Sequence, residues 1–75
     1  MYRIRLENFK ELSYIKPTVY ADFLGLSPNN IYILFRGEST TKLSTAKGII
    51  SVAYKIPLTD EKMDELLEKH FTKEK

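Results

Sequence analysis

Side chains that could carry chemistry are few in this 75-residue chain, which has one histidine and no cysteine. Without cysteine there is no disulfide, no thiol nucleophile and no thiolate metal site. His70 lies on the apolar side of a predicted C-terminal helix, where a lone histidine is more often packed than catalytic. One histidine with scattered carboxylates also lacks the ligand spacing of a metal site. We therefore expect no catalytic residue, no metal and no cofactor, and we predict that the protein is not an enzyme.

Two hydroxyl side chains, Ser44 and Thr45, precede a stretch whose apolar residues recur at helical spacing. Either oxygen could accept a hydrogen bond from the first free amides of that helix, which is the role of an N-cap. Phosphorylation of Thr45 would instead add charge at this point and make it a regulatory position. The sequence favours the cap. Further along, Gly48 would allow the helix to approach a neighbour closely.

A second group, Tyr14, Lys16 and Pro17, marks the predicted start of another helix. Proline suits the first helical position because its missing N–H would have no partner there. A helix N-terminus also attracts anions. A tyrosine hydroxyl without an adjacent base is a weak nucleophile, however. The group therefore predicts a place that favours anions but has no reactive atom.

Strands are predicted from alternation and from β-branched and aromatic residues. They cover residues 1–6, 30–35 and 39–43, the last two forming a hairpin through a turn at 36–38. A fourth strand over 54–58 contains Pro57, which confines it to an edge, an end or a bulge. Because residues 50–58 also alternate, a longer strand after a single helical turn is the alternative.

Three helices are predicted, over residues 17–26, 45–53 and 60–72. The last has Thr59 as its N-cap and a single apolar stripe. That stripe consists of Met63, Leu66, Leu67, His70 and Phe71. Residues 7–15 are predicted as a loop and 73–75 as a frayed end. The result is an α+β fold in one domain over 1–75: a small open-faced sandwich with an antiparallel sheet of three to four strands and helices on one face.

Three segments resemble the histidine-containing phosphocarrier protein family, HPr, of the bacterial sugar phosphotransferase system. Residues 42–52 are similar to the segment in which a regulatory serine opens the second helix of that family. Phe35-Arg36-Gly37 is similar to its Tyr-Asn-Gly hairpin, and Tyr14-Ile15-Lys16-Pro17 falls where the family has His-Ala-Arg-Pro. The resemblance implies an HPr-like open-faced sandwich.

The resemblance also implies which residues have changed. Tyr14 stands for the phosphorylated histidine, Lys16 for the arginine beside it and Thr45 for the regulatory serine. A tyrosine ester transfers phosphate poorly, and lysine lacks the bidentate fork of arginine. We therefore predict a non-catalytic HPr-like protein-interaction module. One alternative is a phosphocarrier or regulatory phosphoprotein acting through Thr45 or another acceptor; a second is a small basic nucleic-acid-binding domain.

Charge and hydropathy indicate which classes of partner the protein can have. The net charge is +2 and the sequence pI about 8.9, but the lysines are spread along the chain and mixed with acids. This pattern favours a protein partner over nucleic acid, which would use Arg3, Arg5, Lys10 and Lys16. No apolar run approaches the ~18 residues that cross a bilayer, and no signal peptide is recognisable. We therefore expect a cytoplasmic protein without membrane contact.

An interaction patch is predicted on the hairpin. If Ile31, Ile33 and Phe35 of a strand point to the helices, then Tyr32 and Leu34 point away from them. Both side chains are largely apolar, so their exposure to water is unfavourable. The alternation therefore predicts a contact patch centred on Tyr32 and Leu34, used by a weak homodimer or by another protein.

Overall fold

The computed structural model describes residues 1–55 and 57–74. Along the chain the elements are β1 (Tyr2–Ile4), the 3-10 helix η1 (Leu6–Asn8), α1 (Pro17–Leu24), α2 (Pro28–Phe35), α3 (Leu43–Tyr54), α4 (Asp60–His70) and β2 (Phe71–Lys73). The α+β class is confirmed. The sheet of three to four strands is wrong, because the described residues form one antiparallel pair, β1 with β2, and an isolated bridge between Tyr2 and Thr41.

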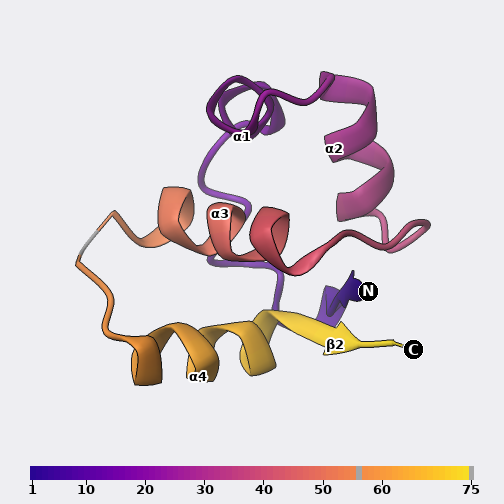
Figure 1. Ribbon diagram of the computed structural model, residues 1–75. Coiled ribbons are helices and arrows are strands. Elements are labelled where there is room, and N and C mark those ends of the chain that lie inside the picture. The colour runs from indigo at the N-terminus through magenta and orange to yellow at the C-terminus, as the bar shows by residue number, and fades with distance from the viewer. Residues whose placement is uncertain (56, 75) are drawn as a thin grey trace.

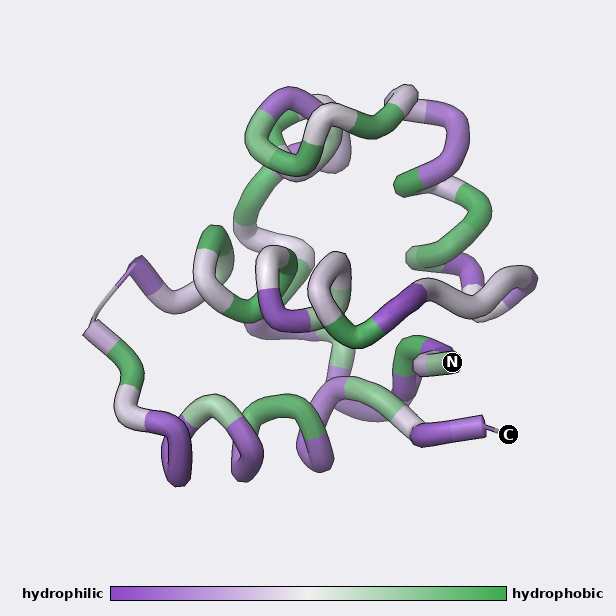
Figure 2. Tube along the Cα trace, viewed as in Figure 1, coloured by the Kyte–Doolittle hydropathy of each residue, from purple (hydrophilic) through white to green (hydrophobic). Residues whose placement is uncertain are grey.

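α3 lies at the centre of the molecule. In Figure 1, α1 and α2 lie on one side of α3, and α4 with the sheet lies on the other. The side chains of Ala46, Ile49 and Ile50 on α3 are fully buried. Figure 2 shows the hydrophilic part of α4 turned away from α3 and its hydrophobic part turned toward it. Helices therefore surround a central helix, and the short sheet adds one buried cross-strand pair, Ile4 and Phe71, to the core.

The largest departure from the sequence prediction is the hairpin over residues 30–43. Residues 28–35 form α2 instead, and the core-facing side chains are Ile31, Leu34 and Phe35, which are spaced as on one side of a helix. The β propensity of this stretch is overridden because Ser27 and Pro28 begin a helix there. The predicted turn after it is confirmed, since Gly37 has a φ of 75°.

The predicted start of α1 at Pro17 is confirmed, but the helix ends at Leu24. α3 was also predicted correctly in type, and it begins at Leu43. The prediction that Ser44 or Thr45 caps it is wrong. Lys42 occupies the N-cap position without a side-chain hydrogen bond, and Thr45 lies within the helix, where it faces the core. The hydroxyls are therefore already part of the first turn.

The environment of Gly48 is the one predicted. A Cβ atom at this position would overlap the side chain of Leu24, so the glycine lets α1 lie close against α3. The strand over 54–58 is wrong for its described residues. Tyr54 ends α3, Lys55 adopts the left-handed conformation with φ 50°, and Ile56 lies outside the described residues. The alternative strand over 50–58 is wrong as well, because its first residues are helical.

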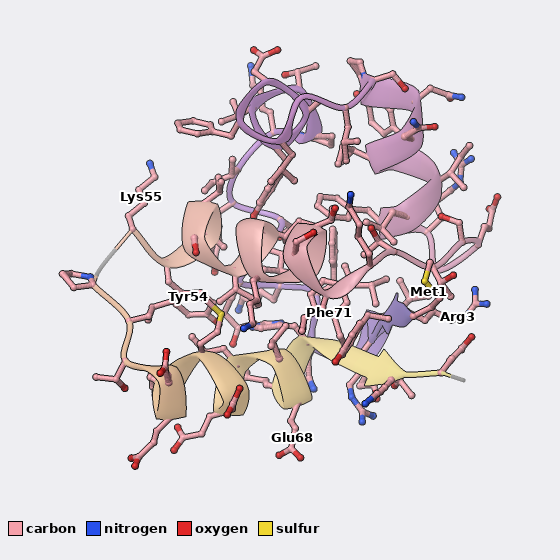
Figure 3. The ribbon with its side chains drawn as sticks, viewed as in Figure 1. Met1, Arg3, Tyr54, Lys55, Glu68 and Phe71 are labelled. Carbon is pink, nitrogen blue, oxygen red and sulfur yellow. The ribbon has the colours of Figure 1, made fainter. Side chains whose placement is uncertain are left out.

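The C-terminal helix is confirmed at its start, where the Thr59 hydroxyl accepts the Lys62 amide at 3.1 Å. It ends at His70, because Phe71 begins β2. The frayed end is wrong for Lys73, which belongs to β2, and for Glu74, whose carboxylate lies 2.7 Å from Arg3 Nε. Lys75 lies outside the described residues. An ion pair therefore connects the first and last strands, and Figures 1 and 3 show the two termini close together.

These helix starts predict a difference between two serines. Ser27 Oγ accepts the Asn30 amide at 3.2 Å, so Ser27→Ala should lower the free energy of unfolding by about 0.5–2 kcal/mol. Ser44→Ala should leave it unchanged or raise it slightly, because alanine has the higher helix propensity. Urea denaturation of both variants measures the difference. Equal losses would contradict the observed helix starts.

Candidate functional site

The residues of the predicted phosphocarrier-like site lie at two helix starts. Tyr14 is 73% exposed in the loop before α1, Lys16 is the N-cap of α1, and Pro17 is its first residue. Ser44 is exposed and Thr45 is buried in the first turn of α3. Within residues 1–55 and 57–74, no hydrogen bond or ion pair joins the two groups. The structure therefore gives them no shared polar contact.

The predicted interaction patch does not exist in the form proposed. Tyr32 is 46% exposed, but Leu34 is only 3% exposed and belongs to the core. The two residues are two positions apart on a helix, so their side chains point in nearly opposite directions. The alternation that placed both outside assumed a strand.

His70 is packed, as the sequence predicted. Its side chain is fully buried, its Nδ1 lies 3.0 Å from the carbonyl oxygen of Asn8, and its Nε2 lies 2.5 Å from the hydroxyl of Tyr54. A carbonyl can only accept, so Nδ1 donates and Nε2 accepts from the tyrosine. Burial lowers the pKa of His70 from its ordinary value, although the bond to Asn8 opposes this. The histidine is thus a neutral link between α4, α3 and the segment after β1.

The pair α1 and α2 with their short connection is the most distinctive unit of the structure. Three residues, Gly25, Leu26 and Ser27, join the helices. Gly25 has a φ of 67°, a conformation that glycine adopts without strain. The Ser27 side chain then caps α2. Figure 1 shows α1 nearly along its axis while α2 runs down the picture, so the helices cross steeply.

Buried contacts hold this crossing in place. Ala21 of α1 is 1% exposed, and the Tyr20 ring meets the ring of Phe35 on α2 edge to face, with centroids 5.1 Å apart. The Tyr20 hydroxyl donates to the Leu12 carbonyl oxygen at 2.9 Å. Burial raises the pKa of Tyr20 to about 12, so this hydroxyl keeps its proton. The two helices therefore pack together as one unit.

One side of α2 faces away from the core, with residues 39–41 beside Ile33. The residues opposite the core-facing side are Asn29, Ile33 and Arg36, at spacings of four and three. Asn29 and Arg36 are exposed, and Ile33 is partly exposed. Arg36 Nε donates to the carboxylate of Glu38 at 3.0 Å, which holds this guanidinium at the C-terminal end of the helix. We refer to Asn29, Ile33 and Arg36 as the outer face of α2.

The helices on either side of α2 in the chain start in the same unusual way. α1 has Lys16 and α3 has Lys42 at the N-cap, and neither N-terminus has a side-chain cap. By contrast, α2 and α4 are capped by Ser27 and Thr59. An uncapped N-terminus leaves amide donors and a positive dipole end free, and the lysine adds a full charge. Both starts suit a phosphate group.

Charge is divided between the two parts of the chain. Residues 16–55 contain five cationic residues, Lys16, Arg36, Lys42, Lys47 and Lys55, and two acidic ones, Asp22 and Glu38. None of the four lysines takes part in a salt bridge among the described residues, and Figure 3 shows Lys55 pointing away from the molecule. Acidic residues instead predominate on α4, where Figure 3 shows Glu68 directed outward.

Sequence reasoning missed this unit although its signals were present. The sequence predicted a helix over 17–26 followed by a strand from residue 30, whereas Pro28 is the first residue of a second helix. Ser27 is a residue type favoured at the N-cap, and Pro28 is favoured at the first position of a helix. Gly25, two residues before Ser27, is a residue type favoured at a helix C-terminus. The run from Gly25 to Pro28 therefore marks one helix end and the next helix start.

No family model, curated protein or solved structure matches this chain. Among the described residues, no helix has both the length and the apolar character needed to span a membrane. The same residues contain no cluster of three or more histidine, aspartate or glutamate side chains suited to a metal ion.

Proposed function

We propose that this protein is a DNA-binding domain of the helix-turn-helix kind. The observation that carries the proposal is the crossing of α1 and α2 through a three-residue turn with a left-handed glycine, because this is the geometry of that motif. In it the second helix enters the major groove and the first crosses the DNA backbone. Here the second helix is α2, whose outer face is directed away from the core.

The size of α2 fits this role. Its eight residues form a helix about 12 Å long, and the major groove of B-DNA is about 12 Å wide, enough to admit an α-helix. Asn29, near the N-terminal end of α2, carries the donor and acceptor groups that base edges require. The core-facing side of the same helix fixes its direction through Ile31, Leu34 and Phe35.

Phosphate contacts would come from the helix starts beside α2. Most protein–DNA hydrogen bonds go to phosphates and sugars, and backbone amides at helix N-termini are among their donors. α1 and α3 offer such amides together with Lys16 and Lys42. Lys47 on α3 adds a further exposed cation. The segment 16–55, which contains the motif, thus carries an excess of cations, although the lysines look evenly spread in the sequence.

This proposal reverses the preference drawn from the sequence, which placed a protein partner ahead of nucleic acid. Two of the cations named for the nucleic-acid alternative are engaged within the fold. Arg3 pairs with Glu74 and donates to the Gly37 carbonyl oxygen, and Arg5 donates to the carbonyl oxygen of Glu68. They serve mainly to tie β1 to the C-terminal part of the chain.

The HPr-like protein-interaction module and the regulatory role of Thr45 stay predictions. The hairpin that contributed to the resemblance is a helix and a turn, and Thr45 has a buried side chain. The exposed Tyr14 and Lys16 remain available to a partner. The structure offers no comparable geometric support for that function, so DNA binding is preferred.

The test measures binding to a labelled duplex of mixed sequence, with fluorescence anisotropy as the readout and over a range of salt concentrations. The logarithm of the binding constant should fall linearly with the logarithm of salt concentration, with a slope of about −0.9 for each phosphate contacted. Lys42→Ala should weaken binding to all sequences and reduce the slope by about 1. Lys62→Ala, on the exposed side of α4, is the matched control and should leave both the affinity and the slope unchanged.

Two results would contradict the proposal. One is the absence of binding to any duplex at low salt by a protein whose circular dichroism shows it to be folded. The other is an equal effect of the two lysine variants, because it would mean that the contact is not located at the start of α3.

A further inference from the structure

The outer face of α2 combines one amide side chain with one apolar side chain. Asn29 and Ile33 are four residues apart, so they are neighbours on the helix surface, with Cβ atoms about 5–6 Å apart. That spacing is close enough for the two side chains to meet neighbouring base pairs, which are stacked about 3.4 Å apart. Asn29 is exposed, and Ile33 is partly exposed although it is a large aliphatic residue.

Each of these side chains has a preferred partner in the major groove. A carboxamide can both donate and accept, so asparagine forms two hydrogen bonds with N7 and N6 of adenine. An aliphatic side chain makes apolar contact with the C5-methyl group of thymine, which guanine and cytosine lack. The two side chains therefore have complementary reasons to favour A·T pairs.

Three other residues of this segment are less suited to this role. Arginine is the usual reader of guanine, but Arg36 follows the last residue of α2, at the end remote from Asn29, and is paired with Glu38. Pro28 has no donor. Asn30 lies to the side of the outer face, where it lines a groove with Ile33 and residues 39–41. Tyr32 is exposed as well, but it lies on the flank of the outer face opposite Asn30. On the outer face itself, Asn29 and Ile33 are thus the side chains available to distinguish bases.

On the basis of the proposed function, we propose that α2 selects A·T pairs, with Asn29 bonding to adenine and Ile33 packing on the methyl group of a neighbouring thymine. One contact is a pair of hydrogen bonds and the other is apolar, so each can be weakened separately by changing one base of the DNA. Replacing adenine by 7-deazaadenine removes N7, and replacing thymine by uracil removes only the methyl group.

The test begins with selection from a library of randomised duplexes, which should yield a core rich in A·T pairs. In that duplex, 7-deazaadenine at the contacted position should lower affinity by about 5–150-fold. Uracil should lower it by about 4-fold, as expected for one buried methyl group. Asn29→Ala should abolish only the affinity loss caused by 7-deazaadenine, and Ile33→Ala only the loss caused by uracil. Asn30→Ala is the matched control and should retain both.

The outcomes separate this inference from the function on which it rests. Salt-dependent binding with a G·C core, or with no loss from either base analogue, would overturn A·T selection and leave DNA binding intact. Loss of both differences in Asn30→Ala but not in Asn29→Ala would also overturn it. No binding to any duplex would overturn the proposed function itself.

Discussion

Replacing Leu34 by alanine is expected to lower the free energy of unfolding by about 2–5 kcal/mol, the usual range for a buried leucine. Leu34 is only 3% exposed and packs in the core beside Ile31 and Phe35. A domain of this size has about 4–11 kcal/mol of stability in total. The loss is therefore a large part of it, and urea denaturation monitored by circular dichroism will measure it.

Tyr32→Ala on the same helix is the matched control. Tyr32 is 46% exposed, and a surface substitution usually changes stability by less than about 0.5 kcal/mol. In a strand Tyr32 and Leu34 would share one side, so both variants would have similar effects. Similar losses would contradict the helix, and with it the geometry on which the proposed function depends.

Stability should also fall as the solution becomes mildly acidic, because of His70. Its pKa is below the ordinary value in the folded protein, mainly through burial, so the unfolded chain takes up the proton first. The stabilisation is fully present above about pH 6.5 and is lost progressively below it, toward the pKa of the folded state. The slope for one proton can reach about 1.4 kcal/mol per pH unit.

Urea denaturation between pH 5 and 7.5 measures this dependence. The paired carboxylates of Glu11 and Glu74 have lowered pKa values, so their effect appears only at lower pH. His70→Gln should remove the slope between pH 5 and 6.5, whereas Tyr54→Phe should lower stability while retaining it. A parent protein with constant stability over this range would contradict the neutral, buried histidine.

Residues whose local signals agree with their burial were predicted well. Thr59 is a good N-cap, acids follow it, and the apolar residues of α4 recur at a single period, so the helix was recognised from its sequence. α3 was recognised for the same reason, although its start was placed two residues late. Its cap has no side-chain signal, because Lys42 occupies that position.

α2 was missed because its residue types favour a strand, whereas its buried residues are spaced as on a helix. Ile31, Tyr32, Ile33 and Phe35 favour strands, and a run of apolar residues this short fits either element. The cap at Ser27 and Pro28 favours the helix, and packing agrees with it, since Leu34 and Phe35 are adjacent in sequence and both buried. The candidate site was missed with it, because the outer face of α2 exists only once the helix has formed.

The pairing of β1 with β2 also constrains how the chain can fold during its synthesis. Helices α1, α2 and α3 are made of neighbouring residues, and contacts of this kind form quickly. Arg3 and Glu74 are 71 positions apart, so the ion pair between them must wait until Glu74 has left the ribosome. Until then β1 has no β2 to pair with. The steeply crossed helices can therefore assemble early, and the sheet closes the structure last.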